Sequence, residues 1–164
     1  LLFMWQVEDL LRANDCNLDQ LERTLLASYE GERKLANRQW LSELCDMMLR
    51  EGVIRQGHLQ INQIVLMQLS ELHQELLSDA KHPFYSSAYF KALPFIVELR
   101  HKGGKQTEEP ELETCFNALY GTMMLRLQKK EISRETTKAI EALSSFLSLL
   151  AREYQLQSSS HYEA

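Results

Sequence analysis

The chain has 164 residues, of which 45% are hydrophobic and 25% are charged, and its formal net charge is -5. This length is enough for one domain with a sizeable core, and the composition is that of an ordinary globular protein. An acidic chain with one short basic cluster argues against nucleic-acid binding, because phosphate recognition depends on clustered Lys and Arg.

The composition also indicates the fold class. Gly and Pro are scarce, with 6 and 3 residues, which favours helix over strand. No stretch combines alternating polar and apolar residues with the β-branched enrichment that is typical of strands. We therefore predict an all-α fold.

The first third of the chain is predicted to form three helices. Residues 1–13 carry an apolar side at helical spacing, made by Phe3, Val7, Leu10 and Leu11. Asn17 suits the cap of a short second helix. Gly31 either separates it from a third helix over about 32–51 or lies within one continuous kinked helix. Gly52 fits the left-handed residue that follows a helix end.

The run from 58 to 77 is predicted to be the central helix. Its apolar residues form two stripes at helical spacing, one of Ile61, Val65, Leu69, Leu72 and Leu76 and one of Leu59, Leu66 and Leu77. A helix that is apolar over this much of its circumference has neighbours on more than one side. Polar residues interrupt it too often for a membrane span.

Three further helical segments are predicted after the central helix. Residues 84–102 contain Pro94, which predicts a kinked helix or two short ones. An exposed loop at 103–109 precedes a helix that begins near Pro110. Ser133 suits the cap of the last helix. Together the segments predict one compact bundle of about six or seven helices around residues 58–77.

The boundaries of the domain follow from these segments. We expect a single domain over residues 1–157, followed by a polar C-terminal tail at 158–164. Because the chain opens without Met, we expect its start to lie upstream of Leu1. Cys16, Cys45 and Cys115 lack metal or redox spacing, so we expect small buried thiols in a reducing, cytoplasmic protein.

Five unbroken stretches of the sequence point to a family. They read MWQVEDL at 4–10, GHLQIN at 57–62, LPFIVELR at 93–100, ETCFNALYG at 113–121 and LRLQKKEIS at 125–133. With these stretches the chain resembles an uncharacterised, mostly Bacteroidetes family of unknown function. The resemblance implies a compact helical domain in a cytoplasmic bacterial protein. It supplies no activity and no catalytic residue.

The most enzyme-like pattern is the pair Glu98 and His101, which lie three positions apart on one helix face. This spacing supplies ligands in di-iron bundles, but such sites need a second pair and two more carboxylates. His101 also lies near a helix end, where a basic side chain complements the helix dipole. Both interpretations stay open here, and no cofactor is predicted.

Two polar residues of the central helix are candidate ligand-binding residues. Asn62 and His73 fall between the two apolar stripes. They form either a hydrogen-bonded polar pair in the core or a polar patch of a pocket lined in part by Tyr89 or Tyr120.

Two arginines on otherwise apolar helix faces are also candidates. Arg100 and Arg126 each either reach solvent, pair with a carboxylate such as Glu8, Glu98 or Glu113, or contribute to an anion-binding or partner-binding site.

The functional prediction follows from the catalytic motifs that the sequence lacks and from its surplus of apolar residues. The sequence shows no catalytic triad, Gly-rich phosphate loop or nucleotide fingerprint, so an enzyme is disfavoured. We predict a non-enzymatic interaction module, a homodimer or partner of another protein, whose surplus apolar residues include Trp5, Trp40, Phe146 and Leu149. The alternatives are a small-molecule-binding helical domain and a metal-dependent enzyme. We expect neither nucleic acid nor a membrane as partner.

Overall fold

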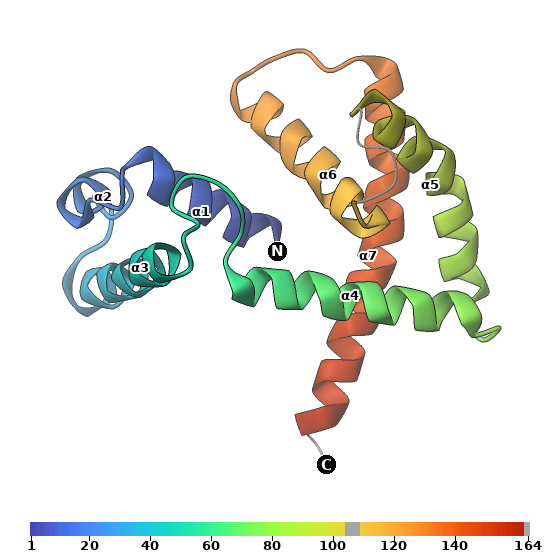
Figure 1. Ribbon diagram of the computed structural model, residues 1–164, viewed down its shortest axis with the longest axis horizontal. Coiled ribbons are helices and arrows are strands. Elements are labelled where there is room, and N and C mark those ends of the chain that lie inside the picture. The colour runs from blue at the N-terminus through green and yellow to red at the C-terminus, as the bar shows by residue number, and fades with distance from the viewer. Residues whose placement is uncertain (104–108, 163–164) are drawn as a thin grey trace. The chain divides into compact units, whose positions relative to one another are not determined.

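The computed structural model describes residues 1–103 and 109–162 of the chain, and Figure 1 shows their arrangement in helices. Over these residues the chain forms seven α-helices and no strand, which confirms the all-α prediction. The exposed loop predicted at 103–109 falls mainly outside the described residues. Within the described part, no helix combines the length and the apolar character that crossing a membrane requires.

The chain divides into two compact units, residues 1–65 and residues 66–164. Helix α4, Gln60–Ser78, begins in the first unit and ends in the second, and it corresponds closely to the predicted central helix. The single domain expected from the length stays a prediction, and each unit is described in turn.

The first unit contains α1 (Leu2–Ala13), α2 (Leu18–Thr24) and α3 (Gly31–Arg50). Its core is one apolar cluster formed by Val7, Leu11, Leu21, Leu26, Leu41, Leu44, Cys45, Met48 and Leu59. Asn17 caps α2 as predicted, since its side-chain oxygen accepts hydrogen bonds from the backbone N–H groups of Asp19 and Gln20, each at 3.1 Å. Trp5, predicted as a surplus surface residue, is instead buried at 2% exposure.

The end of α3 forms the predicted left-handed turn. Gly52 has a φ of 72°, and the Val53 backbone N–H donates to the Met48 carbonyl at 2.9 Å. The segment that follows is held against α1 by Arg12. Its guanidinium donates to the carbonyl oxygens of Val53, at 3.1 Å from Nη2, and of Gly57.

The second unit contains most of α4 together with α5 (Pro83–Lys102), α6 (Glu111–Leu127) and α7 (Arg134–Tyr162). Helix α7 packs against both α5 and α6. The core here is more aromatic than in the first unit. Its buried residues include Leu72, Leu76, Tyr85, Tyr89, Ile96, Leu112, Cys115, Leu143, Phe146 and Leu150. Phe146, predicted as a surplus apolar residue, is fully buried in this core.

Two helices of the second unit differ in extent from the prediction. Helix α5 runs through Pro94 as one element, so the alternative of two short helices was wrong. Helix α7 begins at the predicted cap, where Ser133 Oγ accepts from the Thr136 N–H at 3.1 Å. It continues to Tyr162, so residues 158–162 of the expected polar tail are helical. There Ser158 Oγ donates to a carbonyl of the preceding turn, so serine is compatible with helix at this position.

The buried face of α4 is rotated relative to the predicted one. Leu69, Leu72 and Leu76 are buried as expected, but Ile61 is 42% exposed. Asn62 and His73, by contrast, are 5% and 3% exposed. The buried face therefore includes these two polar residues at one edge, and each has a hydrogen-bond partner in its own unit.

Candidate functional site

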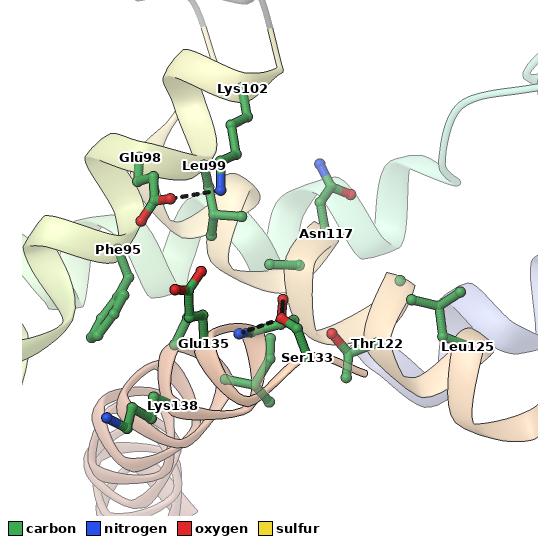
Figure 2. A pocket seen from close by; sticks show the side chains of 15 residues that line it. Phe95, Glu98, Leu99, Lys102, Asn117, Thr122, Leu125, Ser133, Glu135 and Lys138 are labelled. Carbon is green, nitrogen blue, oxygen red and sulfur yellow. Dashed lines mark hydrogen bonds and ion pairs between the residues drawn. The ribbon is translucent and has the colours of Figure 1, made fainter. Parts of the chain in front are cut away.

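The second unit contains a hollow between three helices, which we call the interhelical groove (Figure 2). Its volume is about 590 Å³, and its lining comes from α5, α6, α7 and the residue before α7. Apolar side chains such as Leu99, Ala118 and Ile140 cover part of the wall. Side chains of Asn117, Ser133 and Thr136 add polar groups. A volume of this size and a mixed lining are typical of small-molecule sites.

Small residues explain why the groove is open. Ala118, Gly121 and Thr122 of α6 and Ala139 of α7 line it. A Cβ atom added to Gly121, which is exposed, would meet no atom within 4 Å beyond its chain neighbours and the backbone of its own helix, so packing against other described residues does not require glycine there. A glycine inside a helix costs about 0.5–1 kcal/mol relative to alanine. At Gly121 the chain therefore gives up helix stability and gains open space.

Charged side chains surround one end of the groove. Lys102 Nζ lies 2.6 Å from Glu98 Oε1, and Glu135 lies near them on α7. The hydrogen bond that Lys102 donates to Glu98, and then the negative charges of Glu98 and Glu135, raise the pKa of Lys102. Both members of the Glu98–Lys102 pair are largely exposed, so the pair contributes little to stability.

A second polar cluster lies inside the second unit, around His73. Its Nδ1 is 2.7 Å from the Tyr85 hydroxyl, and the rings of Tyr85, Tyr89 and Phe146 pack edge-on against the imidazole. Burial lowers the pKa of His73, although the charge of Glu111 acts in the opposite direction. The imidazole is therefore neutral at pH 7. Its Nε2 is buried and has no hydrogen-bond partner in the described part of the chain.

In the first unit the most buried polar group is the carboxylate of Glu8, whose exposure is 0%. It is 2.7 Å from His58 Nδ1, and it accepts from the Leu59 N–H at 2.9 Å and from Asn62 Nδ2 at 2.6 Å. Burial raises the pKa of Glu8, but these three hydrogen bonds and the charge of His58 together lower it below its ordinary value. Trp5 stacks on the His58 ring at 4.2 Å between centroids.

The predicted ligand-binding residues are thus placed in separate environments. Asn62 binds Glu8, and His73 binds Tyr85, so the two form no pair with each other in the described structure. Neither lines the interhelical groove, and Tyr120 does not line it either. Of the candidates, only Glu98 does.

The arginines behave differently from each other. Arg100 is half-buried and donates to the backbone carbonyl of Glu109, and its predicted pairing with a carboxylate stays a prediction. Arg126 is exposed in the last turn of α6, where a positive charge complements the helix dipole. A separate hydrogen bond links α5 to α6, since the Tyr89 hydroxyl donates to the Glu111 carboxylate at 2.7 Å.

The candidate metal ligands Glu98 and His101 are both exposed on α5, and Glu98 is paired with Lys102. No cluster of three or more His, Cys, Asp or Glu side chains suitable for a metal ion occurs in residues 1–103 and 109–162. The structure therefore gives the pair no further ligands of these types, and metal ligation stays a prediction without support from geometry.

Sequence reasoning missed the Glu8 cluster and the interhelical groove. One signal for the first was present, because Glu8 stands at helical spacing from the buried Leu11 and so occupies an apolar position of α1. Gly121 was the signal for the second, as a glycine in the middle of a long helical pattern.

Comparison with known proteins places the chain in one family. Residues 1–161 match the family model described as "Domain of unknown function (DUF4924)". The chain therefore belongs to this family, which confirms the resemblance to a family of unknown function. The bacterial origin and the cytoplasmic location that the resemblance implied stay predictions. No curated protein and no solved structure matches the chain.

Proposed function

We propose that this domain of unknown function is a non-enzymatic interaction module that pairs with a second copy of itself through α5. The observation that carries the proposal is an exposed apolar stripe formed by Phe90, Pro94 and Val97. Phe90 is 63% exposed and Val97 is 47% exposed. Their spacing of four and then three residues puts all three on one side of the helix.

The stripe is unusual for a helix that is otherwise well packed. The opposite side of α5 is buried through Tyr85, Tyr89, Ala92 and Ile96. A helix that is apolar on both sides favours neighbours on both sides. Contiguous apolar surface of this kind is typical of protein–protein contacts, whereas single exposed apolar residues are common and need no explanation.

The charges beside the stripe favour a second copy as the partner. Lys91 and Glu98 are exposed and lie one heptad apart, so they occupy the same flank of the stripe. When two identical helices pair antiparallel about a two-fold axis near Pro94, each Lys91 faces Glu98 of the other copy. The surface is therefore complementary to itself, as a two-fold interface requires. The exposed pairing of Glu98 with Lys102 is weak enough to leave Glu98 available.

Sedimentation velocity over a range of concentrations tests the pairing. We expect the wild-type chain to dimerise and Phe90→Glu to weaken dimerisation at least about tenfold, because a central aromatic anchor is replaced by a charge. Phe84→Glu is the matched control. Phe84 is also on α5 and is 85% exposed, but it lies off the stripe. A wild-type monomer at all concentrations, or equal effects of the two variants, would contradict the proposal.

Charge reversal tests the antiparallel orientation separately. Lys91→Glu alone and Glu98→Lys alone each place like charges opposite one another and should weaken the dimer. The double variant restores opposite charges and should recover most of the lost affinity. A double variant as weak as the sum of the two single variants would rule out this orientation while leaving a role for the stripe.

A further inference from the structure

We infer that Cys16 and Cys45 form a site of reversible oxidation, at which hydrogen peroxide converts the two thiols to a disulfide between the α1–α2 turn and α3. Both residues lie in the first unit, whereas the apolar stripe of the proposed pairing lies on α5 of the second unit. Oxidation at this site therefore goes beyond the proposed function and does not depend on it.

The two thiols are in contact in the folded chain, although they belong to different elements. Cys16 lies in the turn between α1 and α2, and Cys45 lies in α3. The Cys45 thiol donates a hydrogen bond to the Cys16 sulfur. Cys45 is also part of the apolar cluster of the first unit, and Cys16 packs against that cluster. Since a disulfide brings its sulfur atoms to about 2 Å, a hydrogen-bonded pair of thiols needs only a short further approach.

The turn that carries Cys16 has a defined conformation. Asp15 and Cys16 both have a φ of 51°, a left-handed conformation that residues other than glycine rarely adopt. Such residues persist only where the surrounding structure holds them. The Asp15 N–H donates to the Arg12 carbonyl at 3.0 Å, and the next N–H, that of Cys16, donates to the Leu11 carbonyl at 2.9 Å. These bonds fix the backbone at Cys16 on the last turn of α1, so its contact with Cys45 belongs to a defined turn.

The different exposure of the two thiols gives each of them a role. Cys16 is half-buried and reaches solvent, whereas Cys45 is 8% exposed. Cys16 therefore meets the peroxide first. Its thiolate sulfur attacks one oxygen, the O–O bond breaks, and the hydroxide that leaves takes up the proton of the Cys16 thiol to give water. Cys16 is then a sulfenic acid.

Cys45 completes the disulfide. Its sulfur attacks the sulfur of the sulfenic acid, the S–O bond breaks, and the leaving hydroxide takes up the Cys45 proton to give a second water molecule. Two thiols and one peroxide thus give one disulfide and two water molecules, and two electrons pass from sulfur to the peroxide. The raised pKa of Cys45, about 12, slows this step, whereas the contact between the two thiols accelerates it through proximity.

Graded oxidation with hydrogen peroxide, followed by alkylation in urea and non-reducing peptide mapping, tests the inference. In the folded wild-type chain we expect one intramolecular disulfide between Cys16 and Cys45, a free Cys115, and complete reversal by dithiothreitol. Cys115 is fully buried in the second unit, so it serves as the internal control. The same oxidation in urea should give a mixture that includes bonds to Cys115. Oxygen added to Cys16 without a disulfide, or the same mixture in both conditions, would overturn the inference.

Serine variants test which thiols are required. Cys115→Ser should form the disulfide as the wild type does, whereas Cys16→Ser and Cys45→Ser should lose it entirely. Cys16→Ser changes a half-buried residue of a turn, so it keeps the test valid if substitution of the buried Cys45 prevents folding. An intramolecular disulfide at the wild-type yield in the folded Cys16→Ser variant would show that the pairing is not selective and would overturn the inference.

The stability of the oxidised chain tests whether the bond fits the folded structure. Its urea midpoint should be higher than that of the reduced chain, because a disulfide restricts the unfolded state. The gain should be present in Cys115→Ser and absent in Cys16→Ser. A lower midpoint after oxidation would show that the bond distorts the folded turn, and would overturn the assignment of this pair as a site of the native chain.

Discussion

Glu8 Oε2 lies 2.7 Å from His58 Nδ1, although the two residues are 50 positions apart in the sequence. The same carboxylate accepts from the Leu59 N–H, at the start of α4. Groups at a helix N-terminus lack partners inside the helix, and a carboxylate there satisfies them and favours the positive end of the dipole. Glu8 thus joins α1 to the first turn of α4 through one fully buried side chain.

The first prediction concerns the loss of this carboxylate. Glu8→Gln replaces one acceptor oxygen by an amide donor in a site where three donors converge, so at least one donor loses its partner. We expect the free energy of unfolding to fall by about 1–3 kcal/mol. Urea denaturation followed by circular dichroism measures it. Glu22→Gln removes a partly exposed ion pair with Lys34 and Arg38 and should have a smaller effect. Equal losses would contradict the buried role of Glu8.

The second prediction is the acid response of the same group. The pKa of Glu8 in the folded chain lies below the ordinary value of 4.5. As the pH falls below about 4.5, the unfolded chain binds a proton that the folded chain does not, so stability is lost. The contribution is fully present above this pH. Urea midpoints between pH 6 and pH 3 should decrease less steeply for Glu8→Gln than for the wild type, and parallel curves would contradict the prediction.

The third prediction uses the neutral His73. Its pKa is lowered from 6.5 by burial, so the unfolded chain takes up the proton first as the pH falls below about 6.5. Stability should therefore decrease below pH 6.5, by up to about 1.4 kcal/mol per pH unit. His73→Gln retains a hydrogen-bonding side chain beside the Tyr85 hydroxyl and removes the titration. The difference in unfolding free energy between wild type and variant should shrink from pH 7 to pH 5.5; a constant difference would show that His73 does not titrate in this way.

The fourth prediction concerns the three free thiols. Burial raises the pKa of Cys115 to about 12, and burial together with contacts to Cys16 raises the pKa of Cys45 to about 12. Because only the thiolate reacts, both should resist iodoacetamide at pH 8. Cys16 is half-buried and should be alkylated first. Intact mass spectrometry with peptide mapping should find all three alkylated in urea. Early modification of Cys115 in the folded chain would contradict its burial.

Local signals were enough to predict the helices and several of their ends. Asn17, Gly52 and Ser133 each act within a few residues of their own position, so their roles follow from short-range geometry. Pro94 was ambiguous because the cost of a proline inside a helix can be offset by packing on the helix's buried side.

The polar interior was harder to predict because its partners are distant in the sequence. Asn62 and His73 were recognised as lying between apolar stripes, yet their partners Glu8 and Tyr85 belong to other helices. The same reason explains the error at Ile61. The hydrophobicity pattern places Ile61 on the apolar side of α4, whereas in the structure Ile61 is exposed and Asn62 and His73 are buried with hydrogen-bond partners.

Trp5 shows a related difficulty. Trp5 was counted among the apolar residues in surplus of the core, but it stacks on His58, whose ring contacts Glu8. Its burial therefore depends on a contact that no single helix contains. Phe90 shows the converse case, since nothing in its local sequence separates it from the buried Tyr89.

The position of Glu8 has a further consequence for the order in which the first unit folds. Its contacts with His58, Leu59 and Asn62 close a loop of about 50 residues, so they cost much chain entropy and should form after the local helices. Interactions that are absent from the transition state govern the unfolding rate rather than the folding rate. Removing the carboxylate that joins α1 to α4 should therefore raise the unfolding rate of the first unit more than it lowers the folding rate. Its contribution is to the lifetime of the folded unit.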